Sequence, residues 1–452
     1  MKIAVVGGGI SGLTCAFWLQ KLGHHVTIFE KKATLGGWVQ SIKTPLGSIV
    51  DVAANGWLDN EPAVHELIEA LEAQEEHIAV QDPKSTRWIV HRDRMVPAPL
   101  SPPMILKTPL LSFFSKIRLL WEPFVRSKSH KNESLADFIK RRLGHGVVDG
   151  LLTPMVAGIY AAHPSELDVR ACFPKLVEWE KTYGSLFQAL RSPNRPKEKP
   201  PVLHSFKNGA GSICERIAQT FDPSHIRFAE VTNIKREHDR WKVHNTESIL
   251  EVDHVVLACP AFVQSRLLQN IDSHIAAYLD QILYSDVAVV VSEYPQHAWK
   301  NRHRGFGALC SQDQDLFGVL GILFTSDIFP SRSPNSHLLT RSILGGTRYP
   351  DVLQWSEKEI QQRVFEAHQK LFGKTEHQAL EVHVWKHKNA IPRYALGHDE
   401  RQREIQRHID QKHPHLSLLG NHLFGVGVKD CIRNGRDCAY KIHKGQILSN
   451  PS

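Results

Sequence analysis

The apolar positions at the start of the chain follow a strand, helix, strand order. An apolar run at 3–6 leads into a glycine-rich turn, and a second apolar run at 26–29 ends at Glu30. Between them Leu13, Ala16 and Phe17 have helical spacing after Gly12. The pattern predicts a βαβ unit, the element with which parallel sheets covered by helices begin.

Later patterns predict further sheets and helices. A fully apolar run at 255–258 is typical of a buried strand that would extend the first sheet. Three more runs predict a second, mostly antiparallel sheet: 287–291, 318–324 and 338–344. Helical spacing is expected over 62–80, 133–190 and 356–372, and a buried strand at 416–421 precedes a last helix. At 452 residues the chain is too long for one core, so we expect an α/β protein of two or three domains.

The first turn has the spacing of a dinucleotide-binding loop. In Gly7-x-Gly9-x-x-Gly12, one glycine makes the turn, one lets the backbone approach a diphosphate, and one lets helix and strand pack closely. The diphosphate would sit at the helix N-terminus. Glu30 can accept hydrogen bonds from ribose hydroxyls and would repel a 2'-phosphate. The stretch predicts an adenine dinucleotide and leaves NAD and FAD open.

Two further glycine turns bear on the choice between NAD and FAD. Gly36 and Gly37 follow soon after Glu30, where a loop can fold back over the diphosphate. An NAD dehydrogenase needs no such loop, and this one resembles the GG-x-x-x-S segment of FAD enzymes of the amine oxidase superfamily. A third turn at 425–428 places another helix N-terminus near the same ligand. These turns favour FAD, bound non-covalently.

Composition excludes only a few classes of protein and of binding partner. The net charge of +8 is compatible with an anionic substrate or surface. The seven cysteines form no CxxC pair and the 27 histidines no HExxH motif, so we expect reduced thiols, no disulfide and no metal site. No apolar run reaches the ~20 residues that span a bilayer, and the chain starts directly on a strand. We therefore expect no signal peptide, no transmembrane helix, a cytoplasmic location and no nucleic-acid partner.

Residues 95–124 differ from the rest of the chain. Prolines interrupt short apolar runs that are flanked by Lys107, Lys116, Arg118 and Arg126. Such a segment suits the mouth of a pocket or the headgroup region of an anionic membrane. The alternative is a helical subdomain that packs its own leucines.

Several motifs together resemble the oxygen-dependent protoporphyrinogen IX oxidases, a family within the amine oxidase superfamily. The resemblance runs nearly end to end, through segments 7–12, 35–41, 155–161, 165–174, 391–398 and 425–432. It implies a Rossmann-like FAD-binding domain of the amine oxidase type, a mixed-sheet substrate domain and a helical membrane-binding domain. The FAD domain would comprise 1–80, 201–262 and 384–452, the substrate domain 81–91 and 263–383, and the helical domain 92–200.

The resemblance also implies a reaction. FAD would oxidise protoporphyrinogen IX to protoporphyrin IX in three hydride steps, six electrons in all, with dioxygen or another acceptor giving hydrogen peroxide. The flavin carries the chemistry, so no catalytic side chain and no metal are assigned. The alternatives are oxidation of coproporphyrinogen III to coproporphyrin III, another enzyme of the amine oxidase fold, or a flavin-binding protein without turnover. A homodimer and peripheral attachment to the cytoplasmic face of the inner membrane stay open.

The expected site residues follow from the glycine turns and from the resemblance. For the cofactor they are Gly7, Gly8, Gly9, Ile10, Ser11, Gly12, Glu30, Lys31, Gly36, Gly37, Trp38, Ser41, Asn55, Gly56, Val231, Trp385, Gly420, Asn421, Val426, Gly427 and Val428. For the substrate the resemblance implies Arg87 as propionate partner, Gly158 for close approach, and Phe306, Leu309 and Ile343 as apolar walls. The chain departs from the family at 53–56, where Ala-Ala-Asn-Gly replaces Gly-Pro-Arg-Gly and the arginine is missing, and at Gln40, which replaces a common basic residue.

Overall fold

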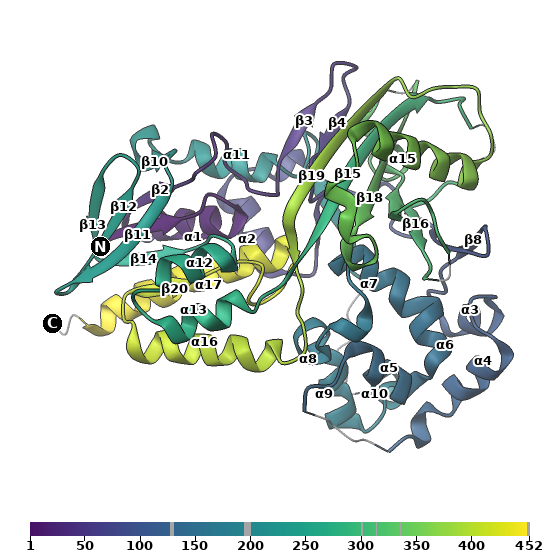
Figure 1. The fold of residues 1–452 in the computed structure, drawn as a ribbon, viewed down its shortest axis with the longest axis horizontal. Coiled ribbons are helices and arrows are strands. Elements are labelled where there is room, and N and C mark those ends of the chain that lie inside the picture. Colours follow the sequence, from purple (N-terminus) through teal and green to yellow (C-terminus); the bar gives the residue numbers. More distant parts are fainter. Residues whose placement is uncertain (127–130, 194–199, 300–301, 313, 335, 450–452) are drawn as a thin grey trace.

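A computed structural model describes residues 1–126, 131–193, 200–299, 302–312, 314–334 and 336–449. The ribbon falls into a part built around a parallel sheet, a part built around a larger and mostly antiparallel sheet, and a helical part between residues 102 and 191 (Figure 1). The α/β class expected from the sequence is confirmed.

The parallel sheet joins distant parts of the chain. Its strand order is β10-β2-β1-β14-β20, and every pair is parallel. The strands are β1 (Lys2–Val6), β2 (His25–Phe29), β10 (Ile226–Arg227), β14 (His254–Leu257) and β20 (Leu416–Leu418). The predicted pairing of the 255–258 strand with the first βαβ unit is confirmed, since β14 lies beside β1. The start, middle and end of the chain therefore meet in one sheet.

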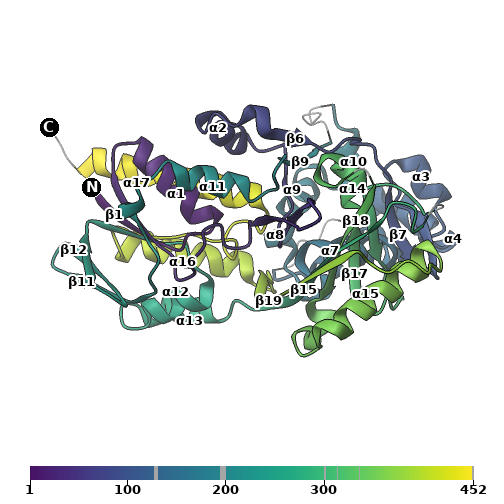
Figure 2. The same ribbon diagram turned by 90° about the horizontal axis from the view of Figure 1, so that it is seen from above.

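Helices cover both faces of this sheet, as its unbroken apolar strands require. Ile3 and Val5 of β1 face the core shared with α1 (Ile10–Lys21), α11 (Ser212–Gln219) and α17 (Val428–Ser449). Ala4 and Val6 face α12 (Ala261–Leu268), α13 (Ser273–Asp280) and α16 (His398–Lys412). Figure 2 shows these two helical layers above and below the strands. A three-stranded antiparallel sheet lies beside the second layer: β11 (Val231–Glu237), β12 (Arg240–Asn245) and β13 (Ile249–Val252).

The second sheet has seven strands in the order β19-β15-β18-β17-β16-β7-β8. They are β7 (Arg87–His91), β8 (Arg94–Pro97), β15 (Tyr284–Pro295), β16 (Gly307–Cys310), β17 (Val319–Leu323), β18 (His337–Gly345) and β19 (Glu381–Pro392). All pairs are antiparallel except β16 with β7, so the prediction of a mostly antiparallel sheet is confirmed. The helix α15 (Glu357–Phe372) covers one face through Ile360, Val364 and Ala367. The other face meets α7 (Thr153–Tyr160) at Leu309.

The helical part has its own core, with Leu135, Phe138 and Val156 among its fully buried residues. Its helices are α3 (Pro102–Lys107), α4 (Phe113–Leu120), α5 (Leu135–Leu143), α6 (His145–Val147), α7, α8 (Val169–Cys172), α9 (Pro174–Tyr183) and α10 (Leu186–Arg191). Shorter turns accompany them: η2 (Glu122–Phe124), η3 (Val148–Leu152) and η4 (Pro164–Glu166). The helical character expected for 133–190 is confirmed.

The remaining elements are short. They are β3 (Ser41–Lys43), β4 (Ile49–Asp51), β5 (Trp57–Leu58), α2 (Pro62–Ala70), η1 (Gln74–Glu76), β6 (His77–Ala79), β9 (Leu203–Phe206), η5 (Pro223–His225), α14 (Thr325–Ile328), η6 (Pro330–Arg332), η7 (Gly346–Arg348) and η8 (Pro350–Leu353). Strands β3 and β4 pair with each other, and β9 lies between β5 and β6.

Two expectations about helices were wrong in detail. The helix expected over 62–80 ends at Ala70, because Glu72 takes a left-handed conformation (φ 53°) and the chain then forms β6, which pairs with β9. The first helix begins at Ile10 and so includes Gly12 instead of following it. No helix in the described part of the chain combines the length and the apolar character needed to cross a bilayer.

Candidate functional site

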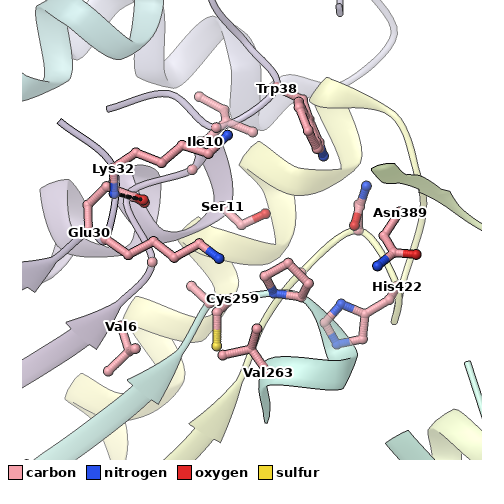
Figure 3. A pocket seen from close by; sticks show the side chains of 18 of the residues that line it. Val6, Ile10, Ser11, Glu30, Lys32, Trp38, Cys259, Val263, Asn389 and His422 are labelled. Carbon is pink, nitrogen blue, oxygen red and sulfur yellow. Dashed lines mark hydrogen bonds between the residues drawn. The ribbon is translucent and has the colours of Figure 1, made fainter. Parts of the chain in front are cut away.

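A cavity of about 420 Å³ opens at the carboxyl ends of the parallel strands (Figure 3). Gly7 follows β1, Glu30 follows β2, Ala258 follows β14 and Gly420 follows β20, and all four line it. Ligands of open parallel sheets bind at this edge, where the loops that follow each strand meet. The volume lies within the ~300–1,000 Å³ of small-molecule sites.

The first glycine turn is built for a ligand on one side and for close packing on the other. A side chain at Gly9 would meet no atom and would stand in the cavity, whereas one at Gly12 would collide with the Gly7 carbonyl oxygen. The first helical hydrogen bond of α1 runs from the Leu13 N–H to the Gly9 carbonyl, 2.9 Å. The amides of Ile10 and Ser11 therefore precede the helical ladder at the cavity wall, where an anionic group can accept from them.

Glu30 is oriented by the backbone around it. Its carboxylate accepts the N–H of Gly8 at 2.8 Å and the N–H of Lys32 at 2.9 Å. A carboxylate offers about four acceptor positions, so it can still accept two ribose hydroxyls. Lys31 and Lys32 line the same end of the cavity and supply positive charge for a diphosphate.

The second glycine turn folds back onto the first. The Gly36 N–H donates to the Gly8 carbonyl at 2.8 Å, and a side chain at Gly37 would approach the Gly9 Cα at 3.2 Å. Both glycines have positive φ, 102° and 61°, which explains the residue type. The next residue, Trp38, meets His387 edge to face at 4.7 Å. The fold-back loop expected from the sequence is thus observed.

The C-terminal turn closes the far end of the cavity. The Tyr394 hydroxyl donates to the Asn421 carbonyl and accepts the Gly425 N–H, each at 2.7 Å, which fixes the loop before α17. Asn421, Val426 and Val428 line the cavity. The first bond of α17 joins the Cys431 N–H to the Gly427 carbonyl at 3.0 Å, so the Val428 amide is a second helix N-terminal donor at the same cavity.

Three wall residues were missed by the sequence reasoning. Asn389 interrupts β19 with a left-handed backbone (φ 51°), held by its N–H donating to Asp286 Oδ1 at 2.6 Å. His422 is buried, burial lowers its pKa to about 3, and its Nδ1 has no partner among the described residues. Figure 3 shows both side chains at the end of the cavity near Trp38. Cys259 lies between Val6 and His422 in Figure 3, and its place after a buried parallel strand could have indicated it.

The cavity gathers most of the expected cofactor residues. These are Gly7, Gly9, Ile10, Ser11, Glu30, Lys31, Gly36, Gly37, Trp38, Val231, Gly420, Asn421, Val426 and Val428. The others lie outside its lining: Gly8, Gly12, Ser41, Asn55, Gly56, Trp385 and Gly427. Ser41 has a structural role there, since its hydroxyl donates to Asp51 at 2.6 Å and accepts the Gly211 N–H at 2.9 Å.

Three of the expected substrate residues, Arg87, Leu309 and Ile343, lie on one face of the seven-stranded sheet. Leu309, Gly321 and Ile343 are cross-strand neighbours in one row, and Arg87, paired with Gly307, lies in the next row on the same face. A side chain at Gly158 of α7 would come within 2.8 Å of Leu309 Cδ2, so this glycine permits the close approach of helix and sheet. The face expected to hold the substrate is therefore continuous.

Arg87 is a half-buried cation. Its guanidinium lies 4.7 Å over the Phe306 ring, and burial lowers its pKa from the usual value. Among the described residues no carboxylate forms an ion pair with it. Arg87 and Phe306 line neither the 420 Å³ cavity nor a second one of about 370 Å³ between α7 and the sheet. The guanidinium therefore lies outside both cavities, with an aromatic ring as its described contact.

A second arginine on the same face of the seven-stranded sheet contacts the 53–56 loop beside the cofactor cavity. Arg341 is buried on β18 and donates to the Ala53 carbonyl, and the neighbouring Ala54 lines the cavity. Burial lowers its pKa to about 10, and Asp51, which would balance its charge, already pairs with the buried Arg332. The loop that lacks the family's arginine therefore receives a guanidinium from another strand.

Comparison with known proteins agrees with this geometry. The family model of the flavin containing amine oxidoreductases matches residues 10–443. A protoporphyrinogen oxidase of Arabidopsis thaliana is 28% identical over 96% of this chain and 92% of its own, and a coproporphyrinogen III oxidase of Bacillus subtilis is 23% identical over 96% of each. A crystal structure from Exiguobacterium sp. 255-15 superposes with a TM-score of 0.85 at 22% identity, covering 98% of this chain and 99% of the other.

Proposed function

Because the chain belongs to the flavin containing amine oxidoreductase family, we propose that it is an FAD-dependent enzyme that oxidises protoporphyrinogen IX to protoporphyrin IX. The balanced reaction consumes three dioxygen molecules and gives three hydrogen peroxide molecules. The observation that carries the proposal is the meeting of three glycine turns at one cavity, in a chain similar to a protoporphyrinogen oxidase over nearly its whole length. The porphyrinogen and the acceptor remain parts of the proposal.

The residues of this cavity fit FAD. The Gly9 position is empty of side chain, the amides of Ile10, Ser11 and Val428 face the cavity, and Glu30 is preset for a ribose. When bound, FAD supplies the hydride acceptor and passes electrons on to dioxygen. The protein's part is to bind, orient and exclude water. Trp38, Asn389 and His422 form the wall at the end away from Glu30, and we assign this end to the reacting ring.

The substrate would be held by charge at one edge and by apolar walls on its faces. Arg87 can donate two parallel hydrogen bonds to a propionate, a fit that a lysine lacks. Leu309 and Ile343 share a sheet face with Arg87, and Phe306, which directly precedes β16, contacts the Arg87 guanidinium through its ring. A large apolar dianion matches such a combination of apolar walls and one cation.

Coproporphyrinogen III is the second candidate, supported by the similarity to the Bacillus subtilis enzyme. It carries four carboxylates where protoporphyrinogen IX carries two, so it would require more cations near the substrate face. Arg348, the cation of the second cavity, already donates to the carbonyls of Ser311, Gln312 and Gln314. We therefore favour the dicarboxylate.

The test is turnover of both porphyrinogens by the purified holoprotein. We expect a flavin absorption spectrum, fluorescent protoporphyrin formation with three peroxides per porphyrin, and a higher kcat/KM for protoporphyrinogen IX. A higher kcat/KM for coproporphyrinogen III would reverse the substrate assignment. Bound flavin that porphyrinogen does not reduce under anaerobic conditions would reject the enzymatic proposal.

We further propose that this chain attaches peripherally to an anionic membrane, at the cytoplasmic face of the inner membrane. Between Leu100 and Phe124 large apolar side chains are exposed: Leu100 60%, Phe113 72%, Phe114 81%, Leu120 58%, Trp121 62% and Phe124 72%. Lys107 within this stretch and Arg126 just after it are also exposed. Aromatic side chains beside lysine and arginine suit a lipid headgroup layer. We name these exposed residues the α4 patch.

Hydrogen bonds and a buried ion pair join the elements of the α4 patch to the rest of the helical part. Arg118 of α4 donates to the carbonyls of Arg141 and Arg142 at the end of α5. Arg142 is fully buried and pairs with the equally buried Glu122, which also accepts the Leu186 N–H at 2.9 Å. The polar groups beneath the patch are therefore buried and hydrogen-bonded, whereas its large apolar side chains are exposed.

Cosedimentation with vesicles tests the attachment. The holoprotein should pellet with vesicles that contain phosphatidylglycerol, and F113S/F114S should remain in the supernatant. L380S removes a 48% exposed leucine away from the patch and serves as control. Equal sedimentation of the double variant and the control would reject the proposal.

A further inference from the structure

The structure brings three potential metal ligands together, with a further histidine beside them, although the histidines follow no metal-binding motif. Asp272 immediately precedes α13, His274 lies in its first turn, and His408 lies in the last turns of α16. The ligand atoms of these three residues all lie within 4.8 Å of one another. His413, the residue just beyond α16, joins the group, since its Nε2 lies 2.7 Å from Asp272 Oδ2.

We propose that these residues form a binding site for a divalent zinc-type cation, a site distinct from the flavin cavity. The donors are three imidazole nitrogens and one carboxylate oxygen, the nitrogen-rich set that Zn²⁺ accepts in four-coordinate sites. An acidic cluster would favour Ca²⁺ or Mg²⁺, but three imidazoles do not. The proposal is independent of the function proposed above.

The carboxylate is already oriented for this task. Asp272 Oδ1 accepts the N–H groups of His274 and Ile275, each at 3.1 Å, which caps α13 and fixes the side chain. Its Oδ2 is thereby turned toward α16, where His408 Nε2 lies at 2.9 Å and His413 Nε2 at 2.7 Å. An outer hydrogen bond that sets the direction of a ligand is a usual feature of metal sites.

Two of the imidazoles, those of His408 and His413, share the Asp272 Oδ2 atom, and the His274 ring stacks beside His408. The rings of His274 and His408 lie 5.1 Å apart and those of His408 and His413 6.3 Å apart, each pair within 28° of parallel. Metal–ligand bonds of ~2.1 Å in a tetrahedron put neighbouring ligand atoms about 3.4 Å apart. The separations of 2.7 and 2.9 Å would open by about half an ångström on binding, and the exposed His274 can approach through side-chain rotation.

The position of the site suggests its effect. Helices α13 and α16 both cover the parallel sheet, through Ile275, Leu279, Ile405 and Ile409. They belong to segments more than a hundred residues apart in the chain. A cation bound between them would link two covering helices and should stabilise the fold without touching the flavin cavity.

Titration of the tag-free, chelator-treated holoprotein with Zn²⁺ tests the proposal. We expect one saturable zinc per chain and a rise in the thermal midpoint of unfolding. H274A and H413A should each weaken zinc binding at least tenfold, with the flavin spectrum and the metal-free thermal midpoint little changed. H145A is the matched control, because His145 also pairs with an aspartate, Asp149 at 2.7 Å, but forms no metal-ligand group among the described residues.

The zinc binding of the three variants distinguishes a specific site from its absence. Zinc binding that is lost in H274A and H413A and retained in H145A supports the site. Absence of saturable binding at equimolar zinc, or equal binding by all three variants, overturns it.

Discussion

At the scale of single residues, the molecule is distinguished by arginines whose charge the protein does not fully balance. Arg87 lies over an aromatic ring with no described carboxylate partner, and Arg341 is buried beside an aspartate that is paired with Arg332. A desolvated cation without a counter-ion is costly unless a ligand completes it. Both arginines face the side of the sheet expected to hold the porphyrinogen and the flavin loop.

The first prediction concerns Arg87. R87A should raise KM for protoporphyrinogen by about tenfold or more, because removing a charge-assisted hydrogen bond costs about 1–3 kcal/mol. The value of kcat should change much less, since the arginine lies away from the cofactor cavity. Steady-state kinetics of the holoenzyme measure both.

R94A provides the comparison for R87A. Arg94 is an exposed arginine on the neighbouring strand β8, so its removal tests for a general effect of charge. An unchanged KM in a folded, flavin-containing R87A variant would contradict the assignment of Arg87 to the propionate.

The second prediction concerns Arg341. R341M should loosen the 53–56 loop, since the Ala53 carbonyl loses its donor, and should weaken FAD binding about tenfold or more. Release of flavin fluorescence on dilution gives the dissociation constant. R348M removes an arginine that also holds a loop by its carbonyls, but beside the second cavity, and should retain FAD normally.

Residues that reach the site from distant parts of the chain could not be predicted from the sequence. The sequence indicates the glycines and Glu30 because their roles follow from local spacing along the chain. Arg341 reaches the loop from nearly 290 residues away, and Asn389 is marked by a backbone conformation within a strand that periodicity alone does not reveal. Such contacts depend on the register of the seven-stranded sheet.

At the scale of elements, the glycines of the N-terminal strand, turn and helix serve two different functions, one in ligand binding and one in packing. Gly9 leaves space for the ligand, and Gly12 lets α1 pack against the turn. Both functions were expected from the spacing, and the surroundings of each glycine Cα agree with them. The boundaries were harder to predict, as the early end of α2 illustrates, because pairing of β6 with β9 overrides the helical pattern.

The third prediction separates the two glycines. G12A should lower the thermal midpoint of the flavin-free protein by several degrees, because the new methyl group collides with the backbone of Gly7. G9A should leave that midpoint unchanged, since Gly9 has an extended backbone (φ −76°) and open space, yet weaken FAD binding at least tenfold. If G9A and G12A behaved alike, the cavity would not be where the diphosphate lies.

At the scale of the whole molecule, the fold is held together by contacts between distant segments. The parallel sheet needs strands from near residues 2, 254 and 416, and the cofactor cavity needs the loops that follow them. The sequence predicts the layers because apolar runs identify buried strands. It does not predict which histidines become enclosed when the layers close, and these decide how the protein responds to acid.

The last prediction follows from three enclosed histidines in different parts of the molecule. Burial lowers the pKa values of His254, His368 and His422 from 6.5 to about 3. Below pH 6.5 the unfolded chain takes up protons that the folded chain refuses until about pH 3. Folding stability is therefore full above pH 6.5 and falls below it, by about 1.4 kcal/mol per pH unit for each histidine.

The window between pH 6.5 and pH 5 isolates this effect, because most carboxylates titrate only below it. The thermal midpoint should fall steadily across the window and stay nearly level from pH 6.5 to 7.5. H368Q removes one buried imidazole and should reduce the slope by about a fifth, because the pKa values of His77 and His398 are also lowered, to about 4, whereas H145A removes an exposed imidazole and should keep the slope. A midpoint that is flat down to pH 5 would mean that these histidines are not enclosed in the folded protein, and that the layers around them close less tightly than the structure shows.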